Sequence, residues 1–153
     1  MLTKMMYTDV LLATDGSDCA REATAHAIDI ATTYDATLHA LYVIETRIGY
    51  DSGIIDPETI ERKLRAEGEA ILDEVESAVR NRNGEVVSTI RRGIPDREIV
   101  DYVEEQAIDL VVLGARGRSK FKTVLLGSTS EAVVRRLSIP VVLMTVSDQG
   151  SVR

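Results

Sequence analysis

Apolar residues gather in short unbroken runs that longer amphipathic segments separate. The runs 10–13 and 110–113 contain no polar position. An unbroken apolar run is typical of a strand buried on both faces, as in a parallel sheet. The segment 85–91 alternates instead, which favours a position near a sheet edge. The pattern predicts five strands, at residues 9–14, 37–44, 85–91, 108–113 and 140–146.

The amphipathic segments between the strands predict helices, because their apolar residues recur at helical spacing. Asp56 and Pro57 form a helix start, and Asn83 with Gly84 ends that second helix. Strand and helix alternate from one end of the chain to the other. This order predicts an α/β fold, a doubly wound parallel sheet with right-handed crossovers and helices on both faces. The other predicted helices cover residues 18–34, 96–106 and 131–136.

The stretch 110–130 joins a buried strand to a glycine-bearing loop and then to a hydroxyl-rich helix start. Gly114-Ala115-Arg116-Gly117 follows the strand, and nine residues separate it from Gly127-Ser128-Thr129-Ser130. Glycines let backbone N–H groups approach an anion, and a helix N-terminus adds further donors. The pattern therefore indicates a phosphate-binding site. The loop also carries a group of cations: Arg116, Arg118, Lys120 and Lys122.

A purely structural interpretation of the same residues remains open. Gly114 and Gly117 are also suited to ending a strand and shaping a turn, and Ser128 to capping a helix. Asp15, at the end of the first strand, favours an Asx-turn in front of Gly16. A carboxylate at that place also suits ribose hydroxyls as a hydrogen-bond acceptor.

The full spacing resembles the ATP-binding signature of the universal stress protein family. The segments 11–17 and 139–143 agree with that family in order and separation. The resemblance implies strand order 3-2-1-4-5, with a switch point between the first and fourth strands. Ligands of open α/β sheets bind outside the carboxyl ends of the strands at such a point. The first turn and the glycine loop are therefore expected to meet at one crevice.

The resemblance also implies a role for each residue of that crevice. It places Ala13, Thr14 and Asp15 beside an adenosine, the Val43 backbone against the adenine, and Leu113 against the nucleoside. ATP is the expected ligand, with Mg²⁺ or Mn²⁺ on its phosphates. The family varies at Arg116. The residues expected to hold the phosphates are Gly114, Arg116, Gly117, Gly127, Ser128, Thr129 and Ser130.

Length and composition argue against several classes of protein. The 153 residues fit one domain, 1–153, and the net charge of −7 argues against general nucleic-acid binding. No apolar run approaches the roughly 18 residues of a membrane span, and residues 1–7 lack the apolar stretch of a signal peptide. Cys19 is the single cysteine, which suits the cytoplasm and predicts a buried thiol. His26 and His39 have no recognisable ligand-forming partner, and His26 is expected to be partly exposed.

Several enzyme motifs are absent from the sequence. It has no Walker loop, no G-x-G-x-x-G after the first strand and no G-x-S-x-G elbow. We find no general base paired with a nucleophile. The sequence favours an ATP-binding regulatory or stress-response protein with slow or no hydrolysis. An ATP-hydrolysing or adenylyl-transferring enzyme of related fold, and an interaction module without nucleotide, remain alternatives.

The last predicted strand, 140–146, is apolar almost throughout and lies at an edge in the implied strand order. Bare apolar edges promote association with other chains. Pairing with the same strand of a second copy closes such an edge with two-fold symmetry. We therefore expect a homodimer through this strand, which the family resemblance also implies.

The loop 45–56 is a segment that could fold over a ligand, but its role stays open.

Overall fold

The computed structural model describes residues 6–46, 56–117 and 126–146. Strands and helices alternate throughout these residues, as the sequence pattern predicts. The predicted cations Arg118, Lys120 and Lys122, and most of the loop 45–56, lie outside the described residues. The elements are β1 (Asp9–Ala13), α1 (Asp18–Thr33), β2 (Thr37–Glu45), α2 (Pro57–Arg80), β3 (Glu85–Gly93), α3 (Pro95–Glu105), β4 (Leu110–Gly114), α4 (Ser128–Arg136) and β5 (Val141–Met144).

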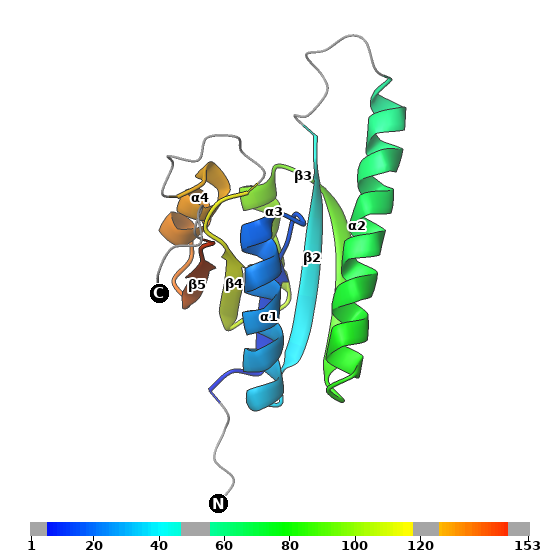
Figure 1. The fold of residues 1–153 in the computed structure, drawn as a ribbon. Coiled ribbons are helices and arrows are strands. Elements are labelled where there is room, and N and C mark those ends of the chain that lie inside the picture. Colours follow the sequence, from blue (N-terminus) through cyan, green and yellow to red (C-terminus); the bar gives the residue numbers. More distant parts are fainter. Residues whose placement is uncertain (1–5, 47–55, 118–125, 147–153) are drawn as a thin grey trace, which may run out of the picture.

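The five strands form one sheet in the order β3-β2-β1-β4-β5 (Figure 1), and every pair is parallel. The predicted fold class and strand order are therefore confirmed. The strand order reverses direction at β1, which pairs with β2 on one side and β4 on the other. The carboxyl ends of β1 and β4 consequently lie next to each other, with Ala13 paired to Leu113.

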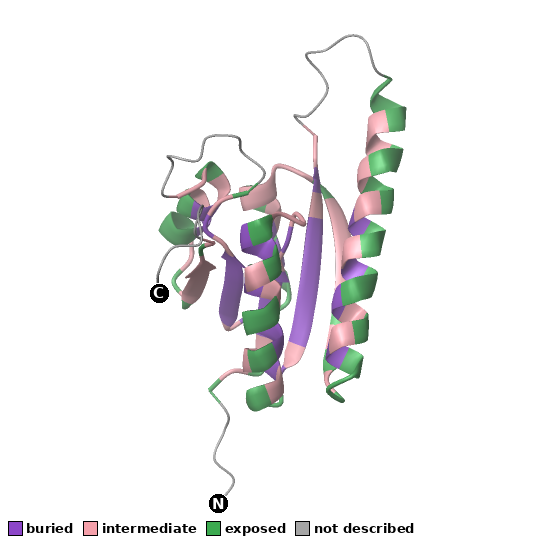
Figure 2. Ribbon diagram, in the orientation of Figure 1, coloured by how far each residue is buried: buried purple, intermediate pink, exposed green. Residues whose placement is uncertain are grey.

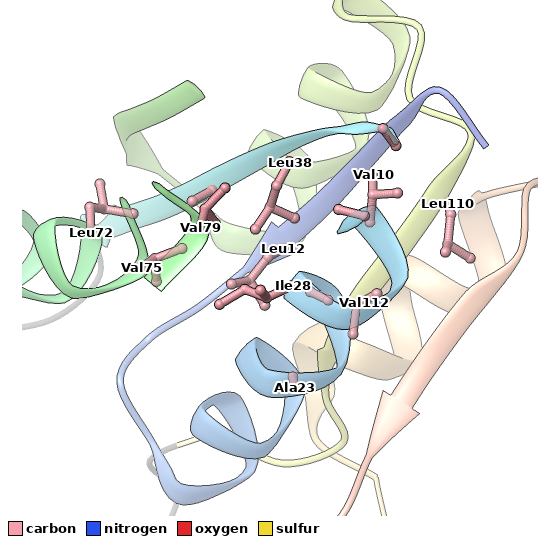
Figure 3. Packing of buried hydrophobic residues seen from close by; sticks show 14 of the residues in the cluster. Val10, Leu12, Ala23, Ile28, Leu38, Leu72, Val75, Val79, Leu110 and Val112 are labelled. Carbon is pink, nitrogen blue, oxygen red and sulfur yellow. The ribbon is translucent and has the colours of Figure 1, made fainter. Parts of the chain in front are cut away.

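Helices cover both faces of the sheet and create two apolar clusters. On one face, α1 and α2 pack against Val10, Leu12 and Leu38, as Figure 3 shows. On the other face, Ile99 of α3 and Val133 of α4 pack against neighbouring strand residues. The inner strands β1, β2 and β4 are accordingly the most buried part of the molecule (Figure 2). Burial on both faces explains their unbroken apolar runs.

Every strand differs from its predicted range at one end or both, and β5 and β3 show the physical reason. β5 covers only Val141–Met144, although the apolar run predicts 140–146. Its partner β4 ends at Gly114, so the last ladder pair joins Gly114 to Met144 and nothing remains for β5 to pair with beyond it. β3 in contrast continues to Gly93, because β2 offers a partner as far as Glu45. Strand length is thus set by the neighbouring strand.

The helix starts follow their local sequences. Ser17 caps α1, its Oγ accepting from the Ala20 N–H at 3.3 Å. Asp56 caps α2 and Pro57 is its first residue, as predicted. At its other end α2 stops at Arg80, and Asn83, with a left-handed φ of 58°, turns the chain toward β3. The predicted stop at Asn83 and Gly84 is therefore a turn that follows the helix end.

The two histidines and the cysteine have different environments. Cys19 is a buried free thiol, as predicted, and the His26 side chain is half-exposed beside Glu22. His39 is buried, and its Nδ1 lies 2.7 Å from the Tyr102 hydroxyl while its Nε2 lies 2.9 Å from Asp9 Oδ1. These partners are 63 and 30 residues away in the chain, so local sequence gives no sign of them.

Among the described residues, no helix is long and apolar enough to cross a membrane.

Candidate functional site

A cavity of about 340 Å³ opens at the carboxyl ends of β1, β2 and β4, which is the predicted place. Its volume lies within the range of small-molecule sites. Residues from β1, the loop after β4 and the start of α4 line it together. All the site residues predicted from the sequence are among its lining: Ala13, Thr14, Asp15, Val43, Leu113, Gly114, Arg116, Gly117, Gly127, Ser128, Thr129 and Ser130.

The turn after β1 is held by one backbone hydrogen bond to β2 and by two hydrogen bonds to its own side chains. The Thr14 N–H donates to the Leu41 carbonyl at 3.0 Å, which fixes the turn on β2. The Ser17 N–H donates to Asp15 Oδ1 at 2.9 Å, and the Gly16 N–H donates to Thr14 Oγ1 at 3.2 Å. Gly16 has a φ of 79°, a conformation that favours glycine. The Asx-turn interpretation of Asp15 is therefore correct.

Asp15 also faces the glycine loop. A Cβ atom added at Gly117 would lie 2.7 Å from Asp15 Oδ2. The two residues stand across the cavity mouth from each other, although 102 positions separate them in the sequence. Glycine at this position therefore leaves room for the carboxylate and keeps the loop backbone accessible from the cavity. Both properties depend on the missing side chain, and not on an unusual φ angle.

Gly114 has a packing role in addition to its place in the cavity lining. An added Cβ would lie 2.8 Å from the Cys19 Cβ and 2.9 Å from the Ala20 backbone nitrogen. The end of β4 thus touches the first turn of α1 directly. Because backbone atoms cannot move aside as a side chain can, the close approach of α1 to the sheet requires glycine here.

The start of α4 completes the loop. Gly127 is the N-cap residue, so no side chain caps this helix, and its N–H donates to the Ala115 carbonyl at 2.7 Å. Ser128 is the first helical residue, so its interpretation as a cap is wrong. Ser130 is buried and donates its hydroxyl proton to the Gly114 carbonyl at 2.7 Å. An uncapped helix start leaves amide donors of its first turn directed toward the cavity.

The Arg116 side chain reaches the chain just beyond the last strand. Its Nη2 donates to the Val146 carbonyl at 2.9 Å. The neighbouring Ala115 N–H donates to the Met144 carbonyl at 2.8 Å. The loop is therefore joined to α4 on one side and to the end of β5 on the other. The sequence interpretation assigned Arg116 to phosphates alone and contained no sign of this second contact.

Eight lining residues were missed by the sequence interpretation. Leu64 belongs to α2, and Pro95 and Ile99 belong to the first turns of α3. These helices close the end of the cavity that lies over β2, and most of their contribution is apolar. No local motif marks such residues, because they reach the cavity only through helix packing. The complete set is Ser17, Ala20, Leu41, Tyr42, Glu45, Leu64, Pro95 and Ile99.

Few residues of the cavity lining carry a charge. Within its described lining, the acidic and basic side chains are Asp15, Glu45 and Arg116, and neither histidine nor cysteine occurs. In the part of the chain that the structure describes, no three His, Cys, Asp or Glu side chains gather as a metal site. The arrangement offers backbone N–H groups and hydroxyls at one end and an apolar wall at the other.

Known proteins resemble this chain in both sequence and structure. A sequence model of the universal stress protein family matches residues 6–145. Universal stress protein MJ0531 of Methanocaldococcus jannaschii is 32% identical over 141 residues, covering 91% of this chain and 82% of the relative. The solved structure of MJ0577, from the same organism, has a TM-score of 0.83 at 27% identity, covering 94% of this chain and 99% of that one.

A further solved structure is a universal stress protein in complex with cAMP. It has a TM-score of 0.71 at 28% identity and covers 93% of this chain and 99% of that one. The family match, the relatives and the strand order all agree with one another. The chain belongs to the universal stress protein family.

Proposed function

We propose that this chain is an ATP-binding universal stress protein that responds to nucleotide and hydrolyses it slowly or not at all. The observation that carries the proposal is the cavity itself, which joins the first turn, the glycine loop and the uncapped start of α4. In this proposal residues 1–153 act as one nucleotide-binding domain in the cytoplasm.

The glycine-loop end suits phosphates. Gly127 as N-cap leaves the first amide groups of α4 to an external acceptor, and the positive end of the helix dipole favours an anion. Gly117 exposes its backbone across from Asp15, and the hydroxyls of Ser128 and Thr129 add further donors. Ser130 takes part through its backbone, since its hydroxyl proton goes to Gly114.

The opposite end suits a nucleoside. Val43 and Leu113 lie at the ends of β2 and β4, where apolar side chains and strand backbone line the cavity together. Asp15 stands between the two ends, in a place where its carboxylate can accept from ribose hydroxyls. A family relative was solved with cAMP, an adenine nucleotide, which supports this choice of ligand class.

A divalent cation fits the proposal only as a companion of the phosphates. Mg²⁺ usually keeps several waters and takes one or two carboxylates besides phosphate oxygens. Asp15 is the carboxylate nearest the glycine loop within the described lining. Mg²⁺ or Mn²⁺ would neutralise phosphate charge there, which matters in a chain of net charge −7.

Binding without efficient turnover follows from the residue types in the cavity. Neither histidine nor cysteine occurs in its described lining, and we find there no general base paired with a nucleophile. We expect ATP hydrolysis far below the typical enzyme rate of about 10 per second. Turnover near that rate that survives repurification and is lost in Asp15→Ala would favour the enzyme alternative.

Thermal unfolding with and without Mg-ATP tests the proposal. A ligand at a hundredfold excess over its Kd stabilises the folded state by about 2.7 kcal/mol, so the Tm should rise by several degrees. ATP should be preferred to GTP, and denaturing freshly purified protein should release adenine nucleotide. Absence of any shift with ATP, ADP or AMP would favour the interaction module without nucleotide.

A matched pair of variants locates the site. Thr129→Ala removes a hydroxyl from the first turn of α4 and should weaken ATP binding. Thr59→Ala makes the same change in the first turn of α2, away from the cavity, and should leave the affinity unchanged. Calorimetry on both variants measures the difference, and equal affinities would place the nucleotide elsewhere.

We further propose that two copies pair through β5. It is an edge strand whose four residues, all apolar, are only partly buried in one chain. The other edge, β3, carries Arg91 and Arg92, which form ion pairs with α3 and α2. Charged side chains discourage edge pairing, and β5 has none. Antiparallel pairing of β5 with its own copy would give a closed two-fold dimer.

Sedimentation tests the pairing. Val142→Lys with Met144→Lys should give monomer or insoluble protein. Val87→Lys places a charge on an exposed valine of the opposite edge and should leave the dimer intact. Wild-type protein that sediments as a monomer at micromolar concentration, with and without ATP, would exclude this interface.

A further inference from the structure

Helix α2 contains a glycine at its centre, where glycine is unfavourable. Gly68 lies between Leu64 and Leu72, four residues from each, on the face that packs against the sheet. Glycine in a helix interior costs about 1 kcal/mol relative to alanine. Leu64 and Leu72 both supply apolar side chains to this face, so the position of Gly68 in the same row calls for a physical reason.

The reason is the aromatic ring of Tyr42. A Cβ at position 68 would lie 2.5 Å from Tyr42 Cδ1, 2.8 Å from Cε1 and 2.9 Å from Cγ. These distances are far below van der Waals contact, and turning the ring about its Cβ–Cγ bond would not relieve the contact with Cγ, which lies on that axis. The ring therefore occupies the space in front of the helix backbone, and Tyr42 is only 3% exposed.

Tyr42 belongs to the cavity as well as to this contact. It lines the cavity over β2, and so does Leu64, one helical turn before Gly68. Pro95 and Ile99 of α3 line the same end from the other face of the sheet. The width of this end is consequently set by how closely two helices approach β2, and Gly68 fixes that approach for α2.

We propose that Gly68 and Tyr42 together determine the size of the planar group that the cavity accepts. This inference rests on the proposed function, in which the nucleobase occupies this end and the phosphates occupy the glycine loop. The ring cannot retreat toward α2, because the helix backbone is already in contact with it. The pair therefore sets the α2 side of the base site, and it acts by positioning, without requiring a bond to the ligand.

Gly68→Ala tests this directly. The added methyl group must push the Tyr42 ring or move α2 outward together with Leu64, and either response changes the wall of the base site. We expect ATP affinity to fall by about tenfold, the usual effect of a misplaced methyl group in an apolar pocket. Tripolyphosphate, which has no base, should bind Gly68→Ala as it binds the wild type. Competition calorimetry with both probes gives the ratio of ATP affinity to tripolyphosphate affinity for each variant.

Gly84→Ala is the matched control. Its Cβ would lie 2.8 Å from Val79 Cγ1, a comparable clash just beyond the other end of α2, and neither residue lines the cavity. It should leave the ratio of ATP to tripolyphosphate affinity unchanged. A change of that ratio in Gly84→Ala equal to that in Gly68→Ala would mean that general strain on α2 causes it, and would overturn the proposal.

A double-mutant cycle identifies the ring as the intermediary. Tyr42→Leu replaces the rigid ring with a smaller side chain that lacks Cε1 and can change rotamer, so Gly68→Ala should cost less ATP affinity in this background than in the wild type. Tyr42→Leu should also accept ATP with a benzyl group on the adenine N6, which the wild type should reject. Undiminished loss from Gly68→Ala in the Tyr42→Leu background would overturn the proposal.

The outcomes separate this inference from the proposed function. Wild-type protein that binds neither ATP nor tripolyphosphate contradicts both. Wild-type protein that binds ATP, with equal losses of ATP and tripolyphosphate affinity in Gly68→Ala, contradicts the size-setting role alone. A selective loss of ATP affinity that Tyr42→Leu suppresses supports it.

Discussion

The two ends of the cavity are built in different ways. The glycine-loop end is lined largely by backbone and hydroxyl groups of residues 114–117 and 127–130 and of the turn after β1. The opposite end is made of side chains that four separate elements supply, among them Tyr42, Leu64 and Ile99. The first end depends on glycines, which have no side chain, and the other end depends on which side chains are present.

This difference has a consequence for tolerance to substitution. At the glycine-loop end, any added atom meets a backbone or a carboxylate, because Gly114, Gly117 and Gly127 all lie close to neighbouring chain. At the other end, apolar side chains of similar volume can replace one another with modest cost. We therefore expect the first end to fail abruptly when altered and the second to change its selectivity.

The largest effect on stability is expected for Gly114→Ala. Its Cβ would lie within 2.9 Å of backbone atoms of Cys19 and Ala20, so α1 must move away from the sheet. We expect the free energy of unfolding to fall by about 3 kcal/mol, the upper range for an overpacked site. Urea denaturation measures it. Gly127→Ala, whose nearest contact would be 3.3 Å, should lose clearly less, and equal losses would contradict the packing role.

Gly117→Val should separate binding from folding. Its Cβ would meet only the Asp15 carboxylate, which can turn aside, so the protein should stay folded. The side chain should block phosphates from the loop backbone and remove the stabilisation of about 2.7 kcal/mol expected at a hundredfold excess of ligand. Circular dichroism and the thermal shift with Mg-ATP measure the two properties. An unchanged ATP affinity would show that the loop is only structural.

Two serines of α4 should differ in the property that they affect. Ser128→Ala should weaken ATP binding by about 1 kcal/mol with little change in stability, since a hydroxyl contact to phosphate is lost. Ser130→Ala should lower the free energy of unfolding by about 1 kcal/mol, because the Gly114 carbonyl loses its buried donor. Denaturation and calorimetry on both variants test the assignment, which the reverse pattern would refute.

The smallest expected effect concerns Tyr102, a buried residue of α3, the helix that also supplies residues to the apolar end of the cavity. Burial of Tyr102 raises its pKa above the ordinary value of 10.0. Below pH 10 the phenol is neutral in both states; above it the unfolded chain loses the proton first, so stability falls as pH rises. Tyr102→Phe should remove part of this alkaline loss. If the free energy of unfolding falls equally with pH above 10 in the wild type and in Tyr102→Phe, Tyr102 does not cause the loss.

The fold and one end of the cavity could be predicted from the amino-acid sequence. Unbroken apolar runs identified β1 and β4, since strands covered on both faces exclude polar residues. The glycine spacing identified the loop between β4 and α4, because those residues are close in the chain and follow a local rule. The meeting of the turn at Asp15 with the glycine loop followed from the strand order that the family resemblance implied.

The remaining features depend on contacts between segments that are far apart in the chain. The length of β5 depends on where β4 ends, and the buried contacts of His39 join residues far apart in the chain. The contact of Gly68 with Tyr42 depends on how closely α2 approaches β2, which no spacing within either segment encodes. Local patterns fix which face of an element is buried. The distance between packed elements, and thus the apolar end of the cavity, is settled only when all the side chains meet.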